Sequence, residues 1–386
     1  MSARSGPLLT RRELRGTILA CLGLGLIAFL LSGRLAGEMA DLEVYWTAAS
    51  RAAAGEPLYR AEDGHYQFKY LPAFAVVTAP LGALPWPAAK TAWFVLSAML
   101  LPWLIVLAIA LVPRPRKPTW VLAVATTVVM AKFFGHELVL GQVNVLFAVV
   151  VLAAVLATRI GREALAGALL ALAIVIKPYA VLFLPWLLAR RRPASILSAA
   201  AGLGLVVLLP AAIYGVGGAA DLYVAWWQTV TESTAPNLTN NDNVSVAAMY
   251  AKWMGIGQAA MVLAVATNAV LLGLVALVVL RRERTPLPEG LEAALLLTCI
   301  PLISPQGWDY VFLISTPAVV YLVNYEDRLP RALRAVALAS LAIIGLSLFD
   351  LMGRAAYSTF MALSIITVCY LVVVGALVVL RVRAVA

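Results

Sequence analysis

Long apolar runs separated by short polar segments make up most of the 386-residue chain. A helix needs roughly 20 apolar residues to cross a bilayer. The runs that could do so fall at 16–32, 70–85, 87–112, 119–135, 141–158, 163–188, 195–214, 259–280, 290–303, 309–324, 331–349 and 358–380. This pattern predicts an all-α polytopic membrane protein with about 12 transmembrane helices. Several runs are short, so the range is ten to thirteen, and residues 1–386 are expected to form a single membrane domain.

Composition supports a membrane protein rather than a soluble one. The chain is 63% hydrophobic and 12% charged, with a mean hydropathy of +0.93, whereas soluble domains average about 25% charged residues. The net charge of +10 could indicate nucleic acid binding. However, the basic residues cluster at the ends of apolar runs, as orientation signals do, so the expected partners are membrane lipids and not nucleic acid.

The basic residues predict an orientation in the cell membrane. Arginines near the N-terminus and basic segments at 189–193, 281–284, 328–334 and 381–383 mark cytoplasmic turns under the positive-inside rule. We therefore expect both termini to be cytoplasmic and 16–32 to be a retained span rather than a cleaved signal peptide. The segments 33–69, 215–258 and 304–309 then face the extracytoplasmic side.

One basic segment conflicts with this threading. Twelve spans counted in order place "PRPRK" at 113–117 outside, which the positive-inside rule disfavours. Either 70–85 is only a half-span, or 163–188 is broken at Lys177-Pro178, because a residue before proline avoids the α region. The sequence leaves the threading of spans two to six open.

The first outer segment, 33–69, contains a short predicted helix. Residues 41–54 suit an amphipathic helix on the membrane surface, ended by Gly55 and Pro57. Leu42, Trp46, Ala49 and Ala53 would share its apolar face. Asp41 lies on a neighbouring face, where it could serve in chemistry or only complement the helix dipole.

Four further polar features interrupt the apolar pattern. Lys177 lies within "ALAIVIKPYAVLFLP", and a lysine inside an apolar run is a functional hypothesis by default, unless it snorkels to the surface. The other three are "GHELVLGQVNVL" at 135–146, where Gly141, Gln142 and Asn144 start a span, "APNLTNNDNVSVAAMY" at 235–250 and "SPQGWDYVF" at 304–312. They could line a cavity, or serve only as a helix end, a polar loop and an interfacial Trp with a capping Asp.

Familiar catalytic motifs are absent from the sequence. It has no GxxxxGK[ST] nucleotide loop, no HExxH, no G-x-S-x-G and no carboxylate-rich metal site. We therefore expect no metal and no cofactor. If there is chemistry, activation must arrive with the substrate.

An ordered set of segments resembles glycosyltransferase family 87. The set is "DLEVYWTAASRAAAGEPLY", "FKYLPAFAVVTAPLGALP", "GQVNVLFAVVVLAA", "AGALLALAIVIKPYAVLFLP", "NVSVAAM" and "SPQGWDY", within about residues 38–315. The family has the GT-C fold and includes α-1,2-mannosyltransferases that use polyprenyl-phosphate mannose to build glycolipids of the cell envelope. The resemblance implies transfer of a sugar, mannose first, to a lipid or glycan acceptor on the extracytoplasmic face.

The resemblance also implies roles for individual residues. Asp41 matches the aspartate of the family's first outer loop and would be the general base. Lys177 matches the lysine before proline and would hold the donor phosphate. The substrate pocket would be formed by Tyr45, Gln142, Asn144, Asn243, Ser245, Trp308, Asp309 and Tyr310.

Two departures from the family pattern leave the donor open. The family has histidines after the late Trp-Asp, where this chain has Tyr310 and Val311. The family's aromatic-x-Tyr-Pro-Pro stretch reads "FKYLP" here, at 68–72. An arabinofuranosyl donor is therefore an alternative to mannose, and loss of activity is another possibility.

Two other classes of protein are alternatives to an enzyme. A transporter or lipid flippase should show matching broken spans in two halves, and only the break at Lys177-Pro178 is evident. In a structural or assembly subunit, Asp41 and Lys177 would be expendable. The polar, aromatic outer segments favour the enzyme.

Overall fold

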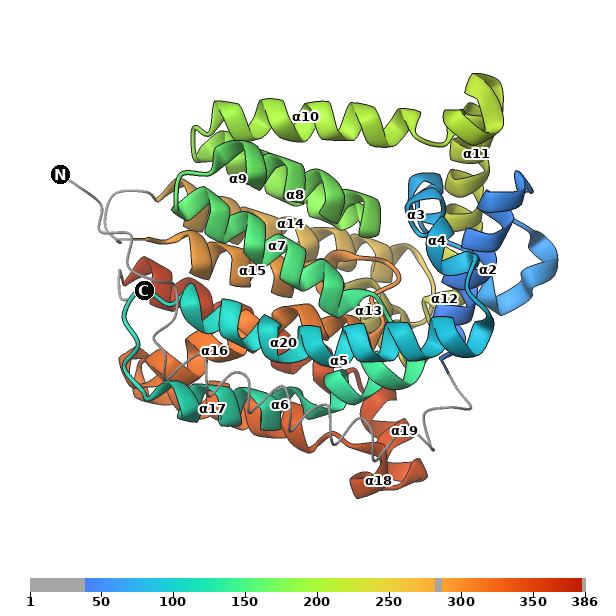
Figure 1. Cartoon of the computed structure of the whole chain (residues 1–386). Coiled ribbons are helices and arrows are strands. Elements are labelled where there is room, and N and C mark those ends of the chain that lie inside the picture. Colours follow the sequence, from blue (N-terminus) through green and yellow to red (C-terminus); the bar gives the residue numbers. More distant parts are fainter. Residues whose placement is uncertain (1–38, 282–286, 384–386) are drawn as a thin grey trace.

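The described part of the chain folds entirely into helices (Figure 1). The computed structural model describes residues 39–281 and 287–383, and within them no strand forms. The longer helices are α2 Ala40–Ala54, α5 Trp86–Ala110, α6 Thr119–Leu140, α7 Asn144–Arg159, α8 Glu163–Ile176, α10 Pro193–Leu208, α11 Ala211–Glu232, α14 Gln258–Leu280, α15 Glu289–Ile303, α16 Thr316–Tyr325, α17 Arg331–Leu346 and α20 Ile365–Val382. Shorter elements are η1 Ala61–Tyr66, α3 Pro72–Val77, α4 Ala79–Gly82, η2 Pro178–Leu182, α9 Phe183–Ala189, α12 Thr234–Asn237, α13 Val246–Met254, η3 Asp309–Ser315, η4 Glu326–Arg328, α18 Phe349–Met352 and α19 Arg354–Ala362.

The long helices run side by side between two ends of the molecule. In Figure 1 the turns that carry most of the basic residues lie at the left end, which we call the basic-loop end. The helix α2 and the short helices α3, α4, α12, α13, α18 and α19 gather at the right end, which we call the site end. Buried Leu, Val, Ile and Phe side chains fill the space between the helices.

Four helices are long and apolar enough to cross a membrane: α5, α6, α14 and α20. The pair of α10 and the segment Ala211–Asn237, bent by 88° at their junction, could count as a fifth. The structure thus supports a polytopic membrane protein. It does not establish the predicted number of 12, since several segments are shorter than a bilayer requires. The first predicted span, 16–32, lies outside the described residues.

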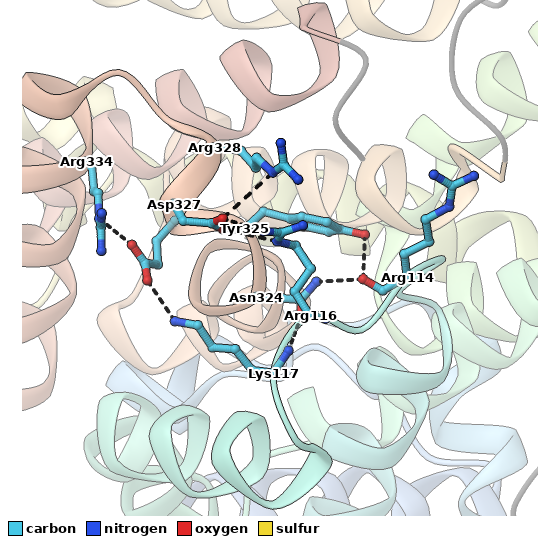
Figure 2. A network of polar contacts seen from close by, with 9 residues as sticks. Arg114, Arg116, Lys117, Asn324, Tyr325, Asp327, Arg328 and Arg334 are labelled. Atoms are coloured by element: carbon cyan, nitrogen blue, oxygen red, sulfur yellow. Dashed lines mark hydrogen bonds and ion pairs between the residues drawn. The ribbon is translucent and has the colours of Figure 1, made fainter.

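The basic segment 113–117 lies at the basic-loop end. Figure 2 shows it packed against residues 324–334. Arg116 pairs with Asp327 at 2.5 Å, and Lys117 pairs with Glu326 at 2.9 Å. Tyr325 donates to the carbonyl oxygen of Arg114 at 3.1 Å. The segment therefore shares one end of the molecule with the other basic turns, contrary to the simple count of spans.

The first of two deviations from the simple count explains this placement. The run 70–85 forms the short helices α3 and α4 and does not cross the bundle. The run 163–188 breaks at Lys177, where the backbone is extended (φ −144°, ψ 117°). The chain also reverses there, because Arg192 beyond α9 pairs with Glu163 at the start of α8, at 3.0 Å. The second deviation keeps residues 189–193 at the same end as the α7–α8 turn.

Candidate active site

Helix α2 carries the candidate base and lies against the α6–α7 turn. Its predicted bounds are confirmed to within one residue, and Gly55 ends it in the left-handed conformation. The predicted apolar face was partly wrong: Tyr45 and Ala52 are buried, whereas Ala53 is exposed. The reason is that α2 packs against α3 and α4, so these protein contacts select the buried face.

Close packing fixes the start of α2. The backbone N–H of Met39 donates to the carbonyl oxygen of Val139 at 2.8 Å. Gly141 ends α6 with φ 67°, and a Cβ placed on it would lie 2.6 Å from the Cβ of Leu42. Only glycine combines this backbone conformation with so close an approach. The site therefore depends on Gly141 to bring Asp41 onto the α6–α7 turn.

A chain of hydrogen bonds orients Asp41. The side-chain amide of Gln142 donates to Asp41 Oδ2 at 2.5 Å, and its oxygen accepts from the Tyr45 hydroxyl at 3.1 Å. Tyr45 in turn contacts the Tyr70 hydroxyl at 2.7 Å. Because Tyr45 occupies the amide oxygen, the amide NH₂ faces Asp41 and stabilises an ionised carboxylate.

A buried acid supports this chain from behind. Glu137 accepts from the backbone N–H of Val145 at 2.7 Å and from the Asn144 amide at 3.0 Å. The same Asn144 NH₂ group lies 3.4 Å from the Gln142 amide oxygen. Asn144 is fully buried, so it lies behind the cavity wall and not on it. Glu137 was not among the residues predicted from the sequence, although a buried acid between two apolar runs is itself a signal of function.

One cavity of about 770 Å³ collects most of the predicted residues. Its lining includes Asp41, Tyr45, Gln142, Lys177, Trp308, Asp309 and Tyr310. We call one side the Asp41 wall: Asp41, Tyr45, Lys69, Tyr70, Gln142 and Lys177. Segments far apart in the sequence, from α2 to the α8–η2 break, therefore meet at one place.

Two cations on the Asp41 wall are available to a ligand. Among the described residues, neither Lys69 nor Lys177 forms an ion pair, although Asp41 acts on both electrostatically. The Lys177 ammonium lies 5.7 Å from the centre of the Tyr70 ring. Burial lowers the pKa of Lys69, and the charge of Asp41 opposes that change. An anionic group entering the cavity would meet both ammonium groups near Asp41.

Burial also acts on the candidate base. It raises the pKa of Asp41 above its ordinary value, while the Gln142 hydrogen bond and the charge of Lys177 oppose the rise. A carboxylate with a raised pKa is a stronger base than an exposed one. Asp41 can therefore accept a proton from a hydroxyl group held beside it.

The late motif places its acid in a buried ion pair. Asp309 Oδ2 lies 2.9 Å from Lys132 Nζ and 3.7 Å from His136 Nδ1. Asp309 and Lys132 are both buried, while the His136 side chain is 39% exposed. Lys132 and His136 come from α6 and were not singled out in the sequence. A lysine within the apolar run "VVMAKFFGHE" was the available signal.

Two predicted pocket residues instead hold the backbone of neighbouring segments. The Asn243 amide donates to the carbonyl oxygens of Asn237 and Pro305, at 3.0 and 2.8 Å. The Ser245 hydroxyl accepts from the N–H of Ala248 as the N-cap of α13. Neither residue lines the cavity, so their contacts shape the loop rather than the inner surface.

No group of three His, Cys, Asp or Glu side chains that could hold a metal ion occurs in residues 39–281 and 287–383. The arrangement that does occur joins a carboxylate, two cations and aromatic side chains around one cavity.

Comparison with known proteins adds one positive finding. The model of glycosyltransferase family 87 matches residues 68–305, which is more than half of the chain. No curated protein and no solved structure matches it.

Proposed function

Because the chain belongs to glycosyltransferase family 87 and is therefore an enzyme that transfers glycosyl groups, we propose that it takes its sugar from a polyprenyl-phosphate donor. The observation that carries the proposal is the meeting of Asp41 and Lys177 on one wall of one cavity. A base and an unpaired cation are the two groups that such a transfer needs.

The proposed reaction is a single displacement. The acceptor hydroxyl gives its proton to Asp41 as its oxygen forms a bond to the anomeric carbon. The bond between that carbon and the phosphate oxygen breaks, and the electron pair leaves with the polyprenyl phosphate. Phosphate is a good leaving group, so no second carboxylate has to act as an acid. The product sugar has the inverted anomeric configuration.

Lys177 would stabilise the charge that develops on the leaving phosphate. A preorganised cation in a site shielded from water contributes more than the same cation in bulk solvent. Lys69 lies on the same wall and would add a second positive charge. Gln142 would hold Oδ2 of Asp41, which leaves the other carboxylate oxygen for the acceptor hydroxyl.

We propose mannose as the sugar, following the family resemblance, and the extracytoplasmic face as the location. The concentration of basic turns at the end away from the cavity (Figure 1) supports this orientation. Both termini would then be cytoplasmic and the acceptor would be a lipid or glycan.

Sugar transfer by the purified full-length protein in nanodiscs tests the proposal. The donors are polyprenyl-phosphate mannose and polyprenyl-phosphate arabinofuranose, and the acceptor is lipid extract from the source cells. We expect transfer by the wild type and at least a hundredfold slower transfer by Asp41→Asn, as about 10²–10⁴-fold is typical for a lost general base. The matched control is Glu43→Gln, an exposed acid on the same helix. No transfer from either donor by a folded protein, or full activity in Asp41→Asn, would contradict the proposal.

A further inference from the structure

A second carboxylate lies at the far end of the hydrogen-bond chain that begins at Asp41. Glu137 is fully buried and forms no ion pair with any described residue, and the proposed reaction does not use it. One of its oxygens accepts from the N–H of Val145 at 2.7 Å, in the first turn of α7, where a negative charge complements the helix dipole. Capping the helix needs only that oxygen, so the other one requires a separate explanation.

The second oxygen of Glu137 gives the chain a direction. A carboxylate only accepts hydrogen bonds, whereas an amide has a donating NH₂ group and an accepting oxygen. Asn144 turns its NH₂ group toward Glu137 at 3.0 Å, and the same group lies 3.4 Å from the Gln142 amide oxygen. The Gln142 NH₂ group is then left for Asp41 Oδ2, at 2.5 Å. The chain is therefore satisfied throughout only when both of its ends are carboxylates.

The other members of the chain do not set its direction by themselves. The Tyr45 hydroxyl contacts both Gln142 and Tyr70, and a hydroxyl can donate or accept, so it fits either orientation of the Gln142 amide. Asn144 Oδ1 is buried and has no hydrogen-bond partner among the described residues. Because buried polar atoms are normally paired, this cost indicates that the Asn144 NH₂ group is required on the side of Glu137.

We propose that Glu137 is a positioning residue for the base: through Asn144 and Gln142 it keeps an amide N–H facing Asp41. One oxygen of Asp41 is thereby held by Gln142, and the other is left for the acceptor hydroxyl. The name of base rests on the proposed transfer, but the coupling between the two carboxylates follows from the hydrogen bonds alone. Glu137 itself does not line the cavity and touches no substrate.

The pKa of Asp41, measured without substrate, tests this role. Infrared difference spectra of the full-length protein in nanodiscs are recorded against pH, and the protonated carboxyl band that is missing in Asp41→Asn reports Asp41. In Glu137→Gln the new NH₂ group faces Asn144, so both amides of the chain turn over and an oxygen faces Asp41. We expect the pKa of Asp41 to rise by about one to two pH units, the range for a lost hydrogen bond to a charged group.

The sign of the change separates positioning from a simple effect of charge. Removing a negative charge near Asp41 would by itself lower the pKa of Asp41, whereas loss of the amide N–H raises it. In the Gln142→Leu background there is no amide to turn, so adding Glu137→Gln should lower that pKa or leave it unchanged. The other titratable groups that interact with Asp41 are the same in these proteins: Lys177, His65, Lys69, Tyr45, Tyr70 and Tyr310.

Two further variants control for charge and for folding. Glu43→Gln removes an exposed acid from the same helix as Asp41 and should not raise the pKa of Asp41. Asn144→Ala keeps both carboxylates but removes the link between them, so it should raise that pKa by less than Glu137→Gln does. Thermal unfolding shows which variants are folded.

Two results with a folded Glu137→Gln would overturn the role of Glu137. They are a pKa of Asp41 that falls or stays unchanged, and a rise of equal size in the Gln142→Leu background. If Glu137→Gln does not fold, an unchanged pKa in Asn144→Ala would overturn it instead. The proposed transfer fails in a different way, through absence of turnover from both donors, and the expected rise would support the coupling even then.

Discussion

The two ends of the molecule use charged residues differently. At the basic-loop end, Arg116 and Lys117 pair with Asp327 and Glu326 (Figure 2). At the site end, Lys69 and Lys177 form no ion pair within the described residues and line a cavity. The ion pairs at the basic-loop end hold turns together. A charge without a partner loses solvation free energy when it is buried, so it points to a ligand that would bind it.

The largest expected effect separates a lysine without an ion pair from a lysine that has one. Lys177→Ala should weaken donor binding about ten- to hundredfold, because a hydrogen bond between charged groups is lost. Lys117→Ala, at the basic-loop end, should leave donor binding unchanged. Donor dissociation constants of both variants provide the measurement. Equal effects in the two variants would remove the distinction between the ends.

The second effect concerns the close approach that positions the base. Gly141→Ala should destabilise the protein by about 1–3 kcal/mol, since it adds overpacking against Leu42 and strain in a left-handed conformation. Gly135→Ala is the matched control, because a Cβ at Gly135 meets no atom within 4 Å. Thermal unfolding of both variants in one detergent measures the difference. A stable, fully active Gly141→Ala would show that α2 does not need this contact.

The third effect is a shift in the pH dependence of transfer. The base acts when ionised, so activity should fall as the pH falls through the pKa of Asp41. Burial raises that pKa, so the loss should begin at a higher pH than for an exposed aspartate, whose pKa is about 3.9. Gln142→Leu removes a hydrogen bond that lowers the pKa, so it should move the loss to still higher pH.

The control for this shift is Gln258→Leu, an exposed position at the start of α14. Profiles of kcat/KM against pH are compared for the three proteins. A profile in Gln142→Leu that moves to lower pH, or does not move, would contradict the role given to Gln142.

The smallest effect belongs to an exposed ion pair. Arg116→Gln should change stability by no more than about 1 kcal/mol and should not change activity, as exposed ion pairs contribute little. Thermal unfolding and transfer rates are the measurements. A large loss of activity would show that the basic-loop end is coupled to the site.

The sequence predicted the outline of this structure better than its contacts. The bounds of α2 followed from Gly55 and Pro57, and the break at Lys177 followed from the proline after it. The sequence did not predict that the chain reverses its direction at Lys177, since a proline disrupts a helix without setting the direction of the next helix. The buried face of α2 was only partly predicted because α3 and α4 cover it as well.

The site was predicted in part for a similar reason. Asp41 was identified because it lies in a polar outer segment, and Lys177 because it lies before a proline within an apolar run. Lys132 was overlooked because it lies within a run, 119–135, that was read only for its length. Glu137 was overlooked because the segment that contains it was read for its amide side chains. Asn243 has the side chain expected of a sugar contact, yet it holds backbone carbonyls. Local sequence gives the kind of side chain, whereas the fold decides what it faces.

The contact between Gly141 and Leu42 also has an evolutionary consequence. The two residues are 99 positions apart, yet a Cβ at Gly141 would lie 2.6 Å from the Cβ of Leu42. Every residue except glycine has a Cβ, so a smaller side chain at position 42 would not make room, and a larger residue at position 141 would require a change in the entry of α2. Among relatives that keep this arrangement, position 141 should therefore remain glycine, which ties the ancestry of the first outer helix to that of the α6–α7 turn.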